Sequence, residues 1–163
     1  FQGKTVLDIG SSTGGFTDFA LRHGARRVYA VDVGTNQLHH RLRDDRRIIL
    51  HEKTDIRDFE LDCPPDIIVG DVSFISLRDI LPHVSKRLMG SATVLVAMVK
   101  PQFEAGRHLV QKGVVKNAAI RRKILTDFEQ WAKQYFVVLD KKDSTVAGSK
   151  GNVERFYKLQ LKK

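Results

Sequence analysis

A strand–turn–helix segment at residues 6–18 constrains the fold of this chain more than any other part of the sequence. The apolar residues Val6, Leu7 and Ile9 predict a buried strand, and a glycine-rich turn connects it to a helix that begins near Phe16. Glycine accepts positive φ and lets the backbone approach a ligand closely. The free N–H groups at the start of the helix favour an anionic or strongly polar ligand group. We therefore expect a ligand at this junction.

An acidic residue follows the next predicted strand, which covers residues 27–31. This residue, Asp32, comes about 20 residues after the glycine turn, at the position where nucleotide-binding folds bind a ribose. Its carboxylate can accept hydrogen bonds from both hydroxyls of an adenosine ribose. The pair of features indicates a nucleoside-containing cofactor.

Two cofactor classes share this layout. A dinucleotide needs the spacing G-x-G-x-x-G, and here Ser12 occupies the place of the second glycine. The carboxylate of Asp8 would repel a pyrophosphate but suits the ammonium or sulfonium of S-adenosylmethionine. The sequence favours S-adenosylmethionine over a dinucleotide, and a glycine-rich turn without any ligand is the third alternative.

Strand and helix patterns alternate along the chain, which predicts a mostly parallel sheet with helices on both faces. The fold class is therefore α/β, with a Rossmann-like, seven-stranded, mostly parallel sheet that has an antiparallel hairpin at its edge. We expect a single domain over residues 1–163. The predicted strands cover residues 5–9, 27–31, 48–52, 66–71, 92–99, 136–141 and 153–161, and the predicted helices cover residues 16–23, 35–42, 77–88 and 118–134.

Composition excludes several classes of protein. No apolar run approaches the length of about 18 residues that a membrane span needs. The single Cys63 excludes an internal disulfide and fits a reducing compartment, so we expect a cytoplasmic protein. No His/Cys pair has metal-site spacing, and we expect no metal. Because the first residue is Phe1 rather than Met, we expect a piece of a longer protein.

The net charge of +9 indicates a polyanionic partner, of which nucleic acid is the first candidate. The alternative is a basic surface that only confers solubility. The basic residues cluster at residues 22–27, 41–47 and 107–123.

Charged residues also follow the predicted strands that end at the ligand-binding edge. Asp71 ends the fourth strand, and Lys100 ends the fifth, which is fully apolar. Ligands of open α/β sheets lie beyond the carboxyl ends of the strands. Glu154 joins these residues if the last strand runs antiparallel to the others. The alternatives are a structural ion pair for the first two residues and an exposed strand position for Glu154.

Several motifs in the same order resemble the TlyA/haemolysin A family, which belongs to the FtsJ-like ribose methyltransferases. The motifs lie at residues 8–18, 71–76, 99–104, 112–116 and 151–154. The resemblance implies S-adenosylmethionine as methyl donor and the ribose 2′-hydroxyls of ribosomal RNA, free or in ribosomal subunits, as acceptors.

The resemblance also implies a catalytic tetrad of Lys, Asp, Lys and Glu, whose last three members match Asp71, Lys100 and Glu154. The first lysine normally lies in a segment upstream of the first strand, which these residues do not include. Lys4 is no substitute, because it precedes that strand and lies about 15 Å from the ligand edge at ~3.3 Å per residue. The family's N-terminal RNA-binding domain is also outside this chain, so we expect the chain alone to bind the donor but to methylate weakly or not at all.

The predicted site therefore has two parts. Lys100 would orient the ribose hydroxyl and accept or stabilise its proton, with Asp71 and Glu154 holding the amine; the sequence leaves open whether Lys100 is a base or an orienting group. Asp55 is the candidate for the adenine amino group. The predicted donor-binding residues are Asp8, Gly10, Ser11, Ser12, Gly14, Gly15, Phe16, Asp32, Val33, Asp55 and Asp71.

Two other functions remain as alternatives. The chain could be a non-catalytic module that binds S-adenosylmethionine or RNA. A membrane-active haemolysin, as the family name suggests, would need a segment with a lipid face. The apolar stretches of this chain are instead accounted for by the α/β core.

Overall fold

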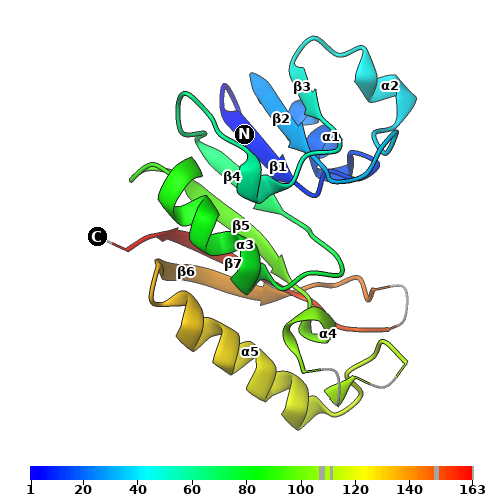
Figure 1. Ribbon diagram of the computed structural model, residues 1–163, viewed down its shortest axis with the longest axis vertical. Helices are drawn as coiled ribbons and strands as arrows, with labels where there is room; N and C mark the ends of the chain where they lie inside the picture. Colours follow the sequence, from blue (N-terminus) through cyan, green and yellow to red (C-terminus); the bar gives the residue numbers. More distant parts are fainter. Residues whose placement is uncertain (107–108, 111, 149–150, 163) are drawn as a thin grey trace.

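The computed structural model describes residues 1–106, 109–110, 112–148 and 151–162. Within these residues, seven strands form one sheet in the order β3-β2-β1-β4-β5-β7-β6 (Figure 1). β7 runs antiparallel to both of its neighbours, and the remaining pairs are parallel. The predicted fold class and the antiparallel hairpin at the edge are confirmed. The strands are β1 (Thr5–Ile9), β2 (Arg27–Val31), β3 (Ile48–His51), β4 (Ile67–Gly70), β5 (Val94–Val99), β6 (Phe136–Asp143) and β7 (Arg155–Leu161).

Helices pack on both faces of the sheet. Neighbouring residues of β1 show this, because successive strand side chains point to opposite faces. Val6 packs with Leu21 of α1, and Leu7 belongs to the larger cluster with Leu81 of α3 and Phe128 of α5. The helices are α1 (Gly15–Arg22), α2 (His40–Arg43), α3 (Leu77–His83), α4 (Pro101–Glu104) and α5 (Ala118–Ala132), with a 3₁₀ turn η1 (Ile56–Asp58) and a π turn η2 (Val84–Leu88).

The second predicted helix, residues 35–42, is wrong over its first half. Only α2 is helical within this range: Asn36 has a φ of +53°, which a right-handed helix does not contain, and the N–H groups of Asn36, Gln37 and Leu38 donate to the carboxylate of Glu52. A side chain that accepts several successive N–H groups stabilises a turn of this kind, which competes with the helix that the local pattern favours.

The segment after β5 differs from the prediction too. The sequence predicts a loop over residues 101–117, but the first of these residues form α4, with Pro101 at the first helical position, where the missing N–H costs nothing. The predicted helix 77–88 is divided into α3 and η2, with Pro82 inside α3.

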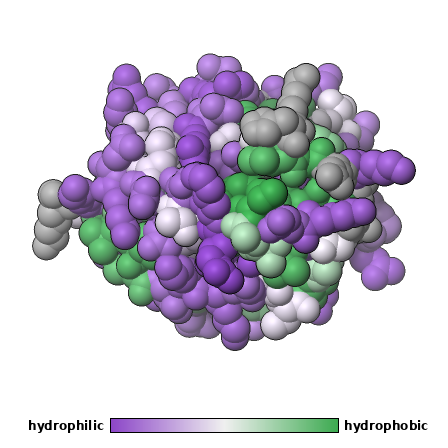
Figure 2. All heavy atoms as spheres, turned by 90° about the horizontal axis from the view of Figure 1, so that it is seen from below, coloured by the Kyte–Doolittle hydropathy of each residue, from purple (hydrophilic) through white to green (hydrophobic). Residues whose placement is uncertain are grey.

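The face shown in Figure 2 is largely hydrophilic, with a hydrophobic patch right of its centre and a smaller one at its lower left. No helix in the described part of the chain is both long enough and apolar enough to cross a membrane.

Candidate active site at the carboxyl edge of the sheet

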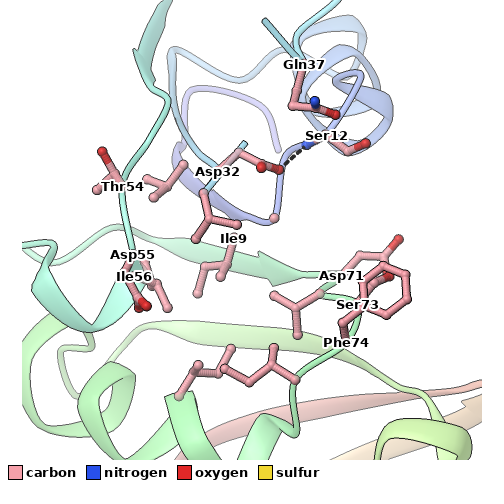
Figure 3. A pocket seen from close by; sticks show the side chains of 16 residues that line it. Ile9, Ser12, Asp32, Gln37, Thr54, Asp55, Ile56, Asp71, Ser73 and Phe74 are labelled. Atoms are coloured by element: carbon pink, nitrogen blue, oxygen red, sulfur yellow. Dashed lines mark hydrogen bonds between the residues drawn. The ribbon is translucent and has the colours of Figure 1, made fainter. Parts of the chain in front are cut away.

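A pocket of about 350 Å³ opens at the carboxyl ends of β1, β2 and β4 (Figure 3). Its wall combines apolar side chains from the strand ends with the carboxylates of three aspartates. This is the edge at which ligands of open α/β sheets bind. The lining residues include Ile9, Gly10, Ser12, Asp32, Val33, Gln37, Thr54, Asp55, Ile56, Asp71, Ser73 and Phe74.

Two glycines of the turn after β1 have no room for a side chain. A Cβ on Gly10 would lie 2.7 Å from the carbonyl oxygen of Asp71, and its φ is +76°. A Cβ on Gly14 would lie 2.5 Å from Leu42 and 2.6 Å from Leu38, at a φ of +96°. The glycines therefore let the turn lie directly against the end of β4 and the segment before α2.

Asp32 links this turn to the segment after β2. Its carboxylate accepts hydrogen bonds from Ser12 N at 2.8 Å and from Gly34 N at 2.7 Å, and the side chain faces the pocket (Figure 3). The second lone pair of each carboxylate oxygen can still accept a hydrogen bond from a ligand hydroxyl.

Asp8 lies beneath the glycine turn and is completely buried. It accepts a hydrogen bond from Thr17 Oγ1 at 2.6 Å, and burial raises its pKa to about 6. Among the described residues, Asp8 Oδ1 and Ser11 Oγ have no hydrogen-bond partner. Buried polar atoms without a partner are rare, and these two suit a cationic or polar group of a ligand.

Asp55 lines the opposite wall of the pocket. Arg57 donates to both oxygens of the carboxylate, and these hydrogen bonds lower the pKa of Asp55 to about 2. The side chain also caps η1 through Arg57 N. Asp55 is therefore ionised at neutral pH and held in one orientation.

The predicted donor residues fall into three groups. Six of them line the main pocket: Gly10, Ser12, Asp32, Val33, Asp55 and Asp71. A neighbouring pocket of about 430 Å³ beside α1 takes Ser11, Gly15 and Phe16, and shares Asp71 with the main pocket. Asp8 and Gly14 are buried behind the turn rather than on either wall.

The predicted pair of Asp71 and Lys100 forms. Lys100 Nζ lies 2.6 Å from Asp71 Oδ1 and donates to Ser73 Oγ at 2.9 Å. The Lys100 side chain is 12% exposed and that of Asp71 is 30% exposed, so the amine is shielded from water more than the carboxylate is. The side chain reaches the boundary between the main pocket and a further pocket of about 390 Å³.

Glu154 lines that further pocket together with Lys100, as the antiparallel direction of β7 predicts. Its carboxylate accepts a hydrogen bond from Gln102 Nε2 at 3.3 Å. Within the described residues, Glu154 makes no ion pair with Lys100. The structure thus brings the three predicted catalytic residues to one edge, with Asp71 as the direct partner of the lysine.

Other residues of these motifs have positions that sequence reasoning missed. The carboxylate of Glu104 accepts from Ser76 Oγ at 2.6 Å and Leu77 N at 2.7 Å, which ties α4 to the start of α3. Burial raises the pKa of Glu104. Phe74 is 92% exposed with a φ of +68°, and its ring centroid lies 5.3 Å from that of Phe103. Contacts between such distant residues leave no pattern in a single sequence.

The basic loop before α5 is anchored beside the site by a buried asparagine. Asn152 donates to Gly113 O at 2.9 Å and accepts from Val115 N at 3.1 Å. The loop cations Lys112 and Lys116 are exposed, and so is Arg122 on α5.

Of the other basic residues considered from the sequence, one is already paired, one is not described by the structure, and one lies far from the site. Arg121 donates to Val153 O and pairs with Asp143 at 2.8 Å, so its charge is already partnered. Arg107 lies outside the described residues. Lys4 pairs with Asp66, which precedes β4, at 3.2 Å; it therefore lies at the opposite edge of the sheet from Lys100.

The described part of the chain contains no group of three or more His, Cys, Asp or Glu residues that could hold a metal ion.

Comparison with solved structures defines the class of the fold. An S-adenosylmethionine-dependent methyltransferase from Mesorhizobium loti superposes with a TM-score of 0.66 over 98% of this chain and 91% of its own, at 14% identity. A hemolysin-named protein from Streptococcus thermophilus superposes with a TM-score of 0.92 at 42% identity, over 98% of this chain and 60% of its own. The fold is that of the S-adenosylmethionine-dependent methyltransferases, and S-adenosylmethionine is the methyl donor of this class, as the sequence predicted.

The family follows from the sequence comparison. The model of the FtsJ-like methyltransferase family matches residues 1–161, and the chain belongs to that family. The 23S rRNA (cytidine-2'-O)-methyltransferase TlyA of Campylobacter jejuni is 41% identical over 157 residues, which is 94% of this chain and 61% of that protein. The chain thus spans less than two thirds of this relative.

Proposed function

We propose that this chain is the catalytic domain of a cytoplasmic enzyme that transfers a methyl group from S-adenosylmethionine to ribose 2′-hydroxyls of ribosomal RNA. The observation that supports this most directly is the Asp71–Lys100 ion pair between the donor pocket and the pocket that contains Glu154. The Campylobacter relative is named for a 2′-O-methylation of rRNA, which agrees with that arrangement.

The donor would lie across the main pocket. The carboxylate of Asp32 would accept hydrogen bonds from the ribose hydroxyls, and that of Asp55 would accept a hydrogen bond from the adenine amino group. The cationic end of the donor would approach the turn above Asp8, whose unpartnered Oδ1 supplies a negative counter-charge. Burial makes such a charge far more effective than it would be in water.

The acceptor would lie in the pocket with Lys100 and Glu154. When bound, S-adenosylmethionine would supply a methyl group that a ribose oxygen can accept as the bond from that methyl group to sulfur breaks and the thioether leaves. Lys100 would donate a hydrogen bond to that oxygen and stabilise the negative charge that develops as its proton leaves. Asp71 and Ser73 hold the lysine in place, and Glu154 remains available as a proton acceptor.

The target nucleotide would enter over Phe74. This exposed ring lies at the mouth shared by the donor pocket and the Lys100 pocket, beside Phe103. An exposed aromatic ring at such a place suits stacking of an unpaired base, which contributes ~1–3 kcal/mol per base. The basic loop anchored by Asn152 lies next to it and would bind phosphates.

We further propose that the longer protein supplies the first lysine of the tetrad and an RNA-binding domain. The chain alone would then bind the donor and methylate weakly. Both the 163-residue chain and the longer protein therefore belong in the test.

The experiment measures transfer of labelled methyl groups from S-adenosylmethionine to purified ribosomal subunits, with the methylated position mapped by resistance of the 3′ linkage to alkali. The expected result is a 2′-O-methylated nucleotide made by the longer protein. Methylation of a base, or of protein, would exclude the proposed reaction. Donor and RNA binding by the longer protein without any transfer would favour the non-catalytic module instead.

A further inference from the structure

The segment between β2 and α2 forms one end of the donor pocket without helix or strand structure of its own. Residues 33–38 contribute Val33 and Gln37 to the pocket wall. The carboxylate of Glu52, just past β3, accepts hydrogen bonds from three successive N–H groups of this segment. The distances are 3.0 Å to Asn36 N, 2.8 Å to Gln37 N and 3.3 Å to Leu38 N.

Arg43 of α2 completes this arrangement. Its guanidinium lies 2.6 Å from Glu52 Oε1, and its Nε donates to Leu38 O at 3.0 Å. The Glu52 side chain is 14% exposed and that of Arg43 is 32% exposed. One carboxylate and one guanidinium thus fix both the N–H groups and the last carbonyl of the segment.

The other end of the segment folds against Asp32. Gly34 N donates to Asp32 Oδ1 at 2.7 Å, and a Cβ on Gly34 would lie 2.6 Å from Gln37 Cγ. Gln37 consequently lies beside Ser12 and close to Asp32, at one end of the pocket (Figure 3).

We propose that Glu52, with Arg43, is a positioning residue for donor binding: it holds the Gln37 amide where it can hydrogen-bond the ribose of the bound nucleoside next to Asp32. This inference rests on the proposed donor pocket. A primary amide offers both a donor and an acceptor, which matches the two hydroxyls of a ribose. The sequence pattern favours a helix here, but Asn36 has a φ of +53°, and the turn that Glu52 and Arg43 hold brings Gln37 to the pocket wall instead.

Two substitutions test the inference in the longer protein. Glu52→Gln keeps the size of the side chain but brings an NH₂ group against N–H donors and Arg43. It should raise the Kd for S-adenosylmethionine about fivefold to tenfold, since one or two hydrogen bonds are lost. The turnover at saturating donor and the KM for ribosomal subunits should stay within about twofold of the wild type. Gln37→Ala removes an exposed amide whose Nε2 donates to Thr35 O at 3.3 Å within the same exposed segment, so the domain should remain folded, and it should weaken donor binding several-fold.

Asp45→Asn is the matched control. Asp45 also accepts a backbone N–H, that of Arg47 at 2.9 Å, and pairs with the Arg47 guanidinium at 2.7 Å, but it is not part of the pocket wall. Its donor affinity should equal that of the wild type. In the double variant Glu52→Gln/Gln37→Ala, the two losses should be less than additive because both act through the same amide.

The outcomes separate the inference from the proposed function. If the wild type does not bind S-adenosylmethionine, the donor site fails and the inference fails with it. If the wild type binds, but Glu52→Gln and Gln37→Ala bind equally well, the inference alone is overturned. A Glu52→Gln variant that loses turnover at saturating donor as much as affinity also overturns the positioning role.

Discussion

The ammonium of Lys100 lies 2.6 Å from the carboxylate of Asp71, where the neighbouring parallel strands β5 and β4 end. Both strands are apolar almost to their last residue, so a charged pair at their carboxyl ends adds no apolar contacts to the core. Because the lysine is 12% exposed and also bonded to Ser73, its amine is held in one place at the rim of two pockets.

Replacement of Lys100 by alanine in the longer protein should abolish methyl transfer to ribosomal RNA. The donor Kd should change less than twofold, because the lysine lies on the acceptor side of the site. Lys100→Arg should fail too, because the larger planar guanidinium cannot occupy the place of the ammonium between Asp71, Ser73 and the ribose oxygen. Transfer rates and titration calorimetry with S-adenosylmethionine measure the two effects separately.

Lys4→Ala provides the control for this substitution. Lys4 also pairs with an aspartate at a strand end, but at the opposite edge of the sheet. It should retain wild-type transfer. A Lys100→Ala enzyme that methylates at the wild-type rate would contradict the catalytic assignment.

Asp32→Ala should weaken S-adenosylmethionine binding about tenfold or more, because an unpaired buried hydrogen-bond group costs ~1–3 kcal/mol. The same change frees Ser12 N and Gly34 N, so thermal stability should fall as well. Asp66→Ala is the control, since Asp66 likewise accepts a backbone N–H, from Thr5 at 2.8 Å, at the far edge of the sheet. An unchanged donor Kd in Asp32→Ala would remove Asp32 from the site.

Much of this architecture could be predicted because local patterns determine it. The boundaries of β1 and β2 match the prediction, since each is a short apolar run between a polar residue and a turn. The meeting of Asp71 and Lys100 also follows from the sequence, because the carboxyl ends of parallel strands share one edge.

What could not be predicted depends on contacts between distant residues. Glu52 holds a turn where the sequence predicts the first half of a helix, and Glu104 caps α3 from α4. Neither carboxylate differs in the sequence from an ordinary surface glutamate. The partnership of Arg121 with Asp143 similarly removes one cation from the expected RNA surface. Tertiary hydrogen bonds of this kind override local propensity.

Asp8 should make stability depend on pH. Its folded pKa of about 6 lies above the ordinary value of 3.8, so the folded state holds the proton more tightly than the unfolded state. The free energy of unfolding should therefore fall as pH rises from about 4 through 6, by about 3 kcal/mol. Asp8→Asn keeps an acceptor for Thr17 and removes the titration. Denaturant unfolding measured at about pH 4.5 and about pH 7.5 covers most of this window. The free energy of unfolding of the variant, relative to that of the wild type, should be larger at the higher pH.

A constant difference between Asp8→Asn and the wild type across this range would contradict the assignment of the titration to Asp8. Asp143→Asn is the control and should differ from the wild type by a constant amount over this range. The hydrogen bond from Arg155 lowers the pKa of Asp143 to about 2, so its contribution is present above about pH 4 and is lost as the pH falls toward 2.

RNA binding should be electrostatic and should depend on the exposed cations near the site. Lys112, Lys116 and Arg122 are exposed beside the Lys100 pocket or at the start of the adjoining helix. Changing all three to glutamine should weaken binding of ribosomal RNA. The slope of log K against log salt should become shallower by about one for each phosphate that the protein no longer neutralises. The donor Kd should stay unchanged.

The control for the RNA experiment neutralises Lys133 and Lys141. Both lysines pair with Glu129, Lys133 at 3.5 Å and Lys141 at 2.5 Å, at the far end of α5. Because counterion release depends on which cations bind phosphates, this change in net charge should leave the slope almost intact if binding is localised at the site. Filter binding or fluorescence anisotropy over roughly 50–300 mM salt, the range in which such interactions are titrated, measures both slopes. If the two sets of substitutions reduce the slope equally per charge, the RNA responds to the overall charge of the protein rather than to the loop anchored by Asn152, and the proposed RNA surface is wrong.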